Sequence, residues 1–350
     1  MSMLRVGRWG PSIHREGKLR LRRTHMRKRI GALANALGLA VALGTTSTAA
    51  QEVPVEEVIL DNGMTVLLMP RPGDPNIAAG WVAKVGSAYE RPGITGVAHL
   101  FEHMMFKGTN TIGTRDIERD LLLIADLDRV KAEIRIEEAS LLEALRLGRI
   151  EDANDAARRT PHHQDLIDRF DALLAEQDEL IIKEDFSRIY SGEGASGMNA
   201  GTSYDFTIYF VNVPANKLEL WFWMESDRLL NPVFREFYAE REVVHEERRL
   251  RTDSTPIGKF EEQFDAMFWQ SSPYSWPVVG WPSDLEGITR EEALDFFGTY
   301  YAPNNLTAAL VGDFDPDEAK TLVETAGGIV KEGVDKASAE EAKEKLEAAG

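Results

Sequence analysis

The residues best suited to chemistry lie close together in segment 97–108. His99 and His103 are four residues apart, and Glu102 follows His99 by three. No glycine or proline interrupts the segment before Gly108, so it is predicted to form one helix that ends there. The three side chains would then share one face. Two imidazoles on that face can hold a zinc ion, and the carboxylate beside them can act as a general base.

The order His-x-x-Glu-His is the inverted zincin signature. The alternative is an exposed helix that carries two histidines by chance. The chain has only seven histidines, and we expect the pattern by chance in roughly one such chain in a hundred. The apolar residues 104–106 that follow also argue against a helix exposed on all sides. The pattern therefore favours a metal site.

The third ligand of this site must come from elsewhere in the chain. Catalytic zinc usually takes three protein ligands, and the absence of cysteine restricts them to histidine and carboxylate. A helix expected over 235–252 places Glu240 and Glu247 on one face, together with Val243 and Val244. Burying carboxylates among valines is costly unless a cation compensates. Glu247 is thus the candidate ligand; an exposed helix with Glu–Arg pairs is the alternative.

The charge balance narrows the class of partner. The chain has 40 basic and 58 acidic residues, a formal net charge of −18. Ten of the basic residues lie in the first fifty positions, so the remainder is more acidic still. Such a body repels nucleic acid, which excludes it as a partner. Acidity could favour basic peptides as substrates, but ordinary solvated charge explains it more simply.

The N-terminal region has the pattern of an export signal. Basic residues 26–29 precede the apolar run Ile30–Leu43, and small residues follow up to Gln51. This is typical of a secretory signal, with Met26 as an alternative to Met1 as the true start. The apolar run is short for a membrane span. We therefore expect export to the periplasm or beyond, with anchoring through an uncleaved signal as the alternative.

The remaining pattern predicts an α+β fold in which helices pack on a mostly antiparallel sheet. Asn62–Gly63 between two apolar-rich runs predicts a hairpin. The other predicted strands are Ile77–Val85, Met198–Tyr204, Asp205–Val213 and Leu306–Val311. The other predicted helices are Leu218–Leu230, Pro256–Met267 and Arg290–Tyr301.

A segment with a different residue pattern is inserted between the two helices that carry the candidate metal ligands. Residues 115–185 combine dense charge with apolar residues three and four apart, interrupted near Thr160–Pro161. This predicts a long helical hairpin. His162 and His163 would lie at its tip, where a solvated loop is a better prediction than a metal role. The hairpin could gate a cleft, dock a partner or act as a spacer.

Several motifs together resemble the insulinase/pitrilysin zinc peptidases, which include the β-subunit of the mitochondrial processing peptidase. The first three are Leu60–Met64, His99–Thr109 and Asn199–Asp205. The others are Glu240–Glu247, Tyr300–Asn305 and Val311–Phe314.

This resemblance implies a ligand set and a mechanism. His99, His103 and Glu247 would hold one Zn²⁺ per chain, Glu102 would be the base that activates water, and Glu240 would support the site. The resemblance further implies that substrate peptides pair with the strand at Asn199 and Ala200. Together, this ligand set, base and substrate strand imply a zinc metalloendopeptidase that acts on peptides or unfolded proteins.

The chain departs from the family pattern in its domain content. We expect residues 1–50 to be an extension and signal, 51–316 a metallopeptidase domain with the insert, and 317–350 an atypical helical tail. The tail resembles part of the C-terminal domain of the bacterial ribosomal stalk protein, which suggests a fusion. Family members work with two homologous domains, so a second domain or chain should complete the cleft. The alternative function is a non-catalytic or half-site subunit that binds peptides or a partner.

Overall fold

The computed structural model describes residues 53–329. The predicted signal and the end of the predicted tail lie outside these residues. Among the helices of the described part, none is long and apolar enough to cross a membrane.

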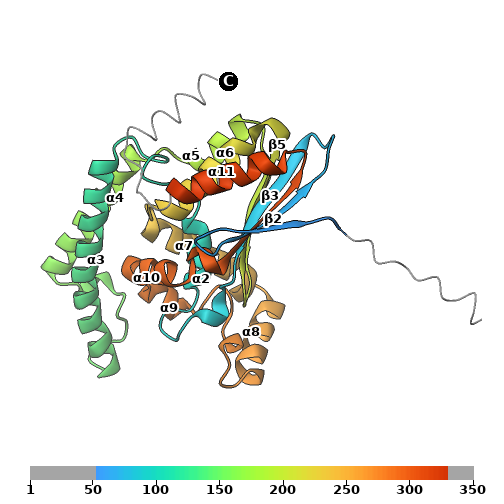
Figure 1. Cartoon of the computed structure of the whole chain (residues 1–350). Coiled ribbons are helices and arrows are strands. Elements are labelled where there is room, and N and C mark those ends of the chain that lie inside the picture. The colour runs from blue at the N-terminus through green and yellow to red at the C-terminus, as the bar shows by residue number, and fades with distance from the viewer. Residues whose placement is uncertain (1–52, 330–350) are drawn as a thin grey trace, which may run out of the picture. The chain divides into compact units, whose positions relative to one another are not determined.

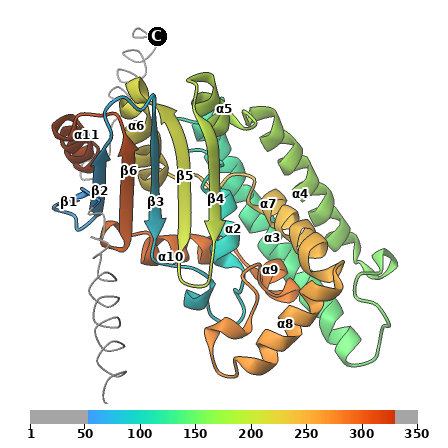
Figure 2. The same ribbon diagram turned by 90° about the vertical axis from the view of Figure 1, so that its right-hand side faces the viewer.

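A six-stranded sheet forms the framework, in the order β1-β2-β6-β3-β5-β4 (Figure 2). Every neighbouring pair is antiparallel except β2 and β6, which run parallel. The prediction of an α+β fold with a mostly antiparallel sheet is therefore confirmed. The strands are β1 (Glu56–Ile59), β2 (Thr65–Pro70), β3 (Asn76–Ala83), β4 (Ser196–Thr202), β5 (Thr207–Pro214) and β6 (Leu306–Gly312).

The strands bury alternate side chains because successive residues point to opposite faces of a sheet. In β3, Ile77, Ala79, Trp81 and Ala83 are all buried, whereas the residues between them are exposed or half-buried. Such alternation is expected where helices cover one face only. The core therefore lies between one face of the sheet and the helices.

Helices α2, α7 and α10 lie between the sheet and a protruding pair of long helices (Figure 1). The shorter helices are α2 (Val97–Met104), α5 (Asp185–Gly192), α6 (Leu218–Leu230), α7 (Phe237–Arg248), α8 (Pro256–Phe268), α9 (Pro282–Gly287), α10 (Arg290–Tyr300) and α11 (Pro316–Ile329). A short π-helical turn, Arg249–Asp253, follows α7.

The predicted helical hairpin of the insert is present as α3 (Ile117–Arg146) and α4 (Pro161–Leu180). The prediction of a loop at its two histidines is wrong, because both lie in the first turn of α4; His162 is exposed as expected, but His163 is not. Thr160 caps α4 by accepting a hydrogen bond from the His163 N–H, and proline occupies the first helical position. His163 is therefore helical and only 3% exposed.

Helix α2 is shorter than the prediction, because it ends at Met104 rather than continuing to Gly108. Gly108 has a φ of +92°, and a Cβ there would lie 2.2 Å from the Ile112 carbonyl oxygen. The chain thus turns tightly at this glycine, and the Thr109 N–H donates to the Ile112 carbonyl oxygen at 2.9 Å.

The start of the predicted tail belongs to the same compact body as the rest. Helix α11 buries Ala319 and Val323 in the main core and packs against α6. Its first turns are therefore an integral layer of the fold. The prediction that the tail derives from a fusion remains a prediction.

Candidate metal centre

The structure brings His99, His103 and Glu247 together. Their ligand atoms all lie within 4.8 Å of one another. His99 and His103 come from α2 and Glu247 from α7, and these two helices pack against each other. The His99 Nε2 lies 3.6 Å from Glu247 Oε1, and the His103 Nε2 lies 3.5 Å from Glu247 Oε2. Two ring nitrogens and one carboxylate thus converge on a single point.

These spacings fit zinc better than they fit hydrogen bonds. Ligands bound to tetrahedral zinc at about 2.0–2.1 Å lie about 3.3–3.4 Å apart. Contacts of 3.5–3.6 Å are long for direct hydrogen bonds. The Nε2 atoms of His99 and His103, which face Glu247, make no hydrogen bond among the described residues, so both are available to a metal ion.

The protonation states suit metal binding at His99. Burial, reinforced by His103 and Arg251, lowers the pKa of His99 to about 3. The ring is therefore neutral near pH 7, which is the form that binds a metal. Burial also opposes charge on His103, but Glu240 and the other nearby carboxylates outweigh it and raise the pKa of that ring.

Glu240, to which the family resemblance assigns a supporting role, contacts His103 on the side away from Glu247. Its Oε2 is 3.3 Å from the His103 Nδ1, the ring nitrogen that faces away from Glu247. Its Oε1 is 2.5 Å from the Lys107 Nζ. A carboxylate in this position orients a ligand histidine and increases its basicity. The valine face predicted beside it is only half present, because Val244 is fully buried but Val243 is 47% exposed.

Glu102 is placed to act as an acid or a base. It shares α2 with the two histidines and is half-buried. Burial raises the pKa of its carboxyl, an effect opposed by the hydrogen bond from Thr202. A carboxyl with a raised pKa exchanges protons more readily near neutral pH.

The N-terminus of α2 is held by Glu90. Gly96 occupies the N-cap position and has no side chain to cap the helix. Glu90 accepts hydrogen bonds from the Gly96 and Ala98 N–H groups instead, at 2.9 and 2.8 Å. Burial outweighs these bonds and raises the pKa of Glu90 from 4.5 to about 8.

We expect Glu90 to make stability fall with rising pH. Because its pKa is higher in the folded than in the unfolded state, its contribution is fully present below about pH 4.5 and is lost as the pH rises through 8. Glu90→Gln should flatten the dependence of the free energy of unfolding on pH between 5 and 9. Urea denaturation with a chelator present measures this. The exposed Glu291→Gln is the control, and an equal slope in all three proteins would contradict the assignment.

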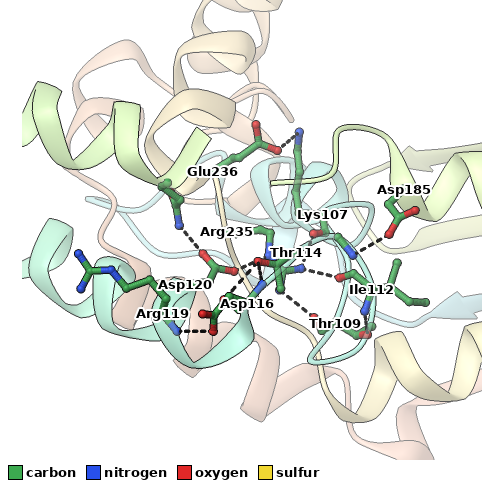
Figure 3. Close-up of polar contacts among 12 residues, drawn as sticks. Lys107, Thr109, Ile112, Thr114, Asp116, Arg119, Asp120, Asp185, Arg235 and Glu236 are labelled. Atoms are coloured by element: carbon green, nitrogen blue, oxygen red, sulfur yellow. Dashed lines mark hydrogen bonds and ion pairs between the residues drawn. The ribbon is translucent and has the colours of Figure 1, made fainter. Parts of the chain in front are cut away.

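The loop that follows α2 is fixed by Arg235 (Figure 3). Its guanidinium donates to the carbonyl oxygens of Lys107, Thr109 and Ile112, and to the carboxylate of Asp120 in α3. Arg235 and Asp120 are both completely buried. Arg235 therefore links the inserted hairpin to the loop that follows α2.

Removing the Asp120 carboxylate should destabilise the fold. Asp120→Ala leaves a buried guanidinium unpaired, which we expect to lower the free energy of unfolding by about 3–5 kcal/mol. The control is the ion pair of Arg119, the neighbour of Asp120 on α3, with Glu176 of α4; both of its side chains are 44% exposed. Glu176→Ala should cost less than about 1 kcal/mol. Chemical denaturation of both variants measures the difference, and similar losses would show that the buried pair contributes little.

Asn199 and Ala200 lie on β4, at the edge of the sheet and near α2. They pair with Phe210 and Tyr209 of β5, so the other edge of β4 has no neighbouring strand in the described chain. The side-chain oxygen of Asn199 accepts a hydrogen bond from the Ala200 N–H at 2.9 Å. Helix α2 contacts this strand directly.

Three contacts of the site were not identified from the sequence. Thr202 donates to Glu102, Lys107 pairs with Glu240, and the Arg251 Nη1 lies 2.5 Å from Glu247 Oε1. The Arg251 contact could have been predicted in part, because Arg251 follows Glu247 by four residues, the spacing at which helical side chains meet. The other two contacts join segments about 100 residues or more apart.

Comparison with protein families supports the resemblance found in the sequence. Residues 65–125 match the family Insulinase (Peptidase family M16), and residues 287–346 match Peptidase M16 inactive domain. The second match takes in most of the predicted tail. The resemblance of the tail to the ribosomal stalk protein gains no support.

Individual relatives agree with these matches. A protein of Helicobacter pylori named zinc protease PqqE is 27% identical over 288 residues, covering 81% of this chain and 49% of the relative. A solved protease structure from the same species has a TM-score of 0.55 at 24% identity, covering 78% and 49% of the two chains.

A second solved structure, of the periplasmic protease PqqL from Escherichia coli, has a TM-score of 0.50 at 21% identity and covers 79% of this chain and 24% of that one. These two structures show a shared fold. The chain spans about half the length of the relatives that it matches over most of its own length.

Proposed function

Since this chain resembles the insulinase family (peptidase family M16) in sequence and fold, we propose that it is the zinc-bearing half of a metalloendopeptidase. The proposed reaction is hydrolysis of peptide bonds in peptides or unfolded proteins. The observation that carries the proposal is the convergence of His99, His103 and Glu247 beside Glu102.

The residues divide the chemistry among them. A zinc ion held by the three ligands supplies a Lewis acid that lowers the pKa of water and polarises a carbonyl oxygen. Glu102 accepts the proton of the attacking water and later donates a proton to the leaving amine. Glu240 fixes the orientation of the His103 ring through its Nδ1.

We place the substrate on the free edge of β4. An extended peptide can add to such an edge through main-chain hydrogen bonds. Asn199 and Ala200 lie on this strand, and its last residue, Thr202, contacts Glu102. A peptide paired with β4 would therefore run past the metal ligands.

We propose that a second homologous half completes the cleft. The chain spans about half the length of its relatives, and the resemblance implies two homologous domains. That half would be a second domain of the same protein or a separate chain, which could be a second copy of this one. The predicted signal and the periplasmic PqqL neighbour support export as the location.

The test combines metal analysis with cleavage of an unstructured peptide, using the chain alone and with its candidate partner. The proposal expects one zinc per chain. It also expects cleavage that stops on treatment with a chelator and returns when zinc is added. Bound zinc without cleavage, even after the partner is added, would rule out the proposed enzyme function for this chain.

The second candidate is a half-site subunit that binds peptides or a partner without turnover. The match of residues 287–346 to the Peptidase M16 inactive domain favours it. Peptide binding measured by fluorescence anisotropy, with no zinc-dependent cleavage in any combination of chains, would select this alternative.

A further inference from the structure

We propose that Thr202 is a positioning residue that fixes the carboxylate of Glu102 toward the scissile bond. This inference rests on the proposed function, because it assigns a partner to the proposed base. Its direct evidence is one contact between distant segments. The Thr202 hydroxyl donates a hydrogen bond of 2.5 Å to Glu102 Oε2.

The bond holds one carboxylate oxygen and leaves the other free. Among the residues that the structure describes, no second side chain donates to Glu102. The proposed base therefore owes its side-chain orientation to this hydroxyl. Oε1 is left without a side-chain donor, and it is available to a water molecule. A base must lie within hydrogen-bond reach of the proton it removes, so the rotation of this carboxylate matters.

Thr202 is itself on a rigid support. It is the last residue of β4 and pairs with Thr207, whose hydroxyl donates to the Val85 carbonyl oxygen. The next residue, Ser203, accepts a backbone hydrogen bond from Ser87 at 3.1 Å. A hydroxyl that is fixed in this way by the sheet can impose a position on a side chain of α2.

The packing at this point leaves little freedom. A Cβ at Gly86 would lie 2.1 Å from the Ser203 carbonyl oxygen, so the loop preceding α2 lies directly against the end of β4. Thr202 and the proposed peptide-binding edge belong to the same strand. The base would thus be set relative to the strand that aligns the substrate. A displacement of about 1 Å can cost about 10²-fold in rate.

The experiment compares Thr202→Val with Thr202→Ser in the zinc-loaded full chain, together with its partner where one is needed. Valine keeps the shape of threonine but removes the hydroxyl, and serine restores the hydroxyl. We expect Thr202→Val to lower kcat about 10- to 100-fold, with KM and zinc content unchanged. Thr202→Ser should recover most of kcat.

A double-mutant comparison tests whether the effect passes through Glu102. In a Glu102→Gln background, Thr202→Val should change the remaining single-turnover rate less than about twofold. A full loss in that background, or failure of the serine variant to recover kcat, would assign Thr202 a merely structural role.

A structural readout separates this inference from the proposed function. Crystal structures of the zinc-loaded wild type and Thr202→Val should show one Glu102 orientation in the first and a displaced or mixed orientation in the second. The same orientation in both overturns the inference. Absence of cleavage by the wild type overturns the proposed function instead, and the crystallographic comparison still tests Thr202.

Discussion

Replacing Glu102 with glutamine is expected to lower kcat between about 10²- and 10⁴-fold, which is the range of general acid–base catalysis. Glutamine keeps the size of the side chain and its hydrogen bond from Thr202, but it cannot accept the proton of water. The loss should appear in kcat rather than KM, because Glu102 acts in the chemical step. Peptide cleavage under saturating substrate measures it.

The metal content supplies the control for this variant. Glu102 is not among the three side chains that converge on the metal position, so Glu102→Gln should still bind one zinc per chain. A variant that loses zinc as well would make Glu102 a ligand or a support for one. Unchanged cleavage by the zinc-loaded variant would remove Glu102 from the mechanism.

The local part of the site could be predicted from the sequence because helical spacing determines it. Residues four apart project from one face, so His99 and His103 had to lie together once α2 formed. The same rule placed Glu240 and Glu247 on one face of α7. The pairing of α2 with α7 was implied by the family resemblance, because periodicity does not specify which helices meet.

Contacts between distant segments could not be predicted in this way. Thr202 reaches Glu102 only because the end of β4 packs against α2, which depends on the order of strands in the sheet. The sequence predicts Arg235 only as the first residue of a helix, yet it is a completely buried cation that binds three carbonyl groups. A lone arginine in a charged segment carries no signal for such a role.

The insert shows how a correct element can have an unexpected role. The sequence predicts the hairpin but does not decide whether it acts as a gate, a docking arm or a spacer. In the structure, the N-terminal half of α3 carries two aspartates that bind residues of the elements around the candidate metal centre. Asp120 binds Arg235, and Asp128 accepts hydrogen bonds from Tyr238 of α7 and Arg290 of α10. Helix α7 carries Glu247, the proposed third ligand, so the insert stabilises the helix that would complete the metal centre.

Replacing Glu247 is the strongest test of the metal centre. Structural zinc sites with four ligands bind with about 10–16 kcal/mol, so one ligand contributes about 3–4 kcal/mol, or roughly 10²- to 10³-fold in affinity. Glu247→Ala should weaken zinc binding by about this factor, and it should leave the fold intact because the side chain is only half-buried. Competition with a fluorescent zinc chelator measures the affinity.

The neighbouring carboxylate provides a graded comparison. Glu240 contacts His103 through the ring nitrogen that faces away from the proposed metal position. Glu240→Gln should therefore weaken zinc binding by only about 10- to 100-fold. The exposed Glu246→Gln, from the same helix, should have no effect. This order follows from position: Glu247 faces the Nε2 atoms of both histidines, Glu240 faces only the Nδ1 of His103, and Glu246 is exposed. A larger loss for Glu240 than for Glu247 would assign the third ligand to Glu240 and place the zinc on the other side of the His103 ring.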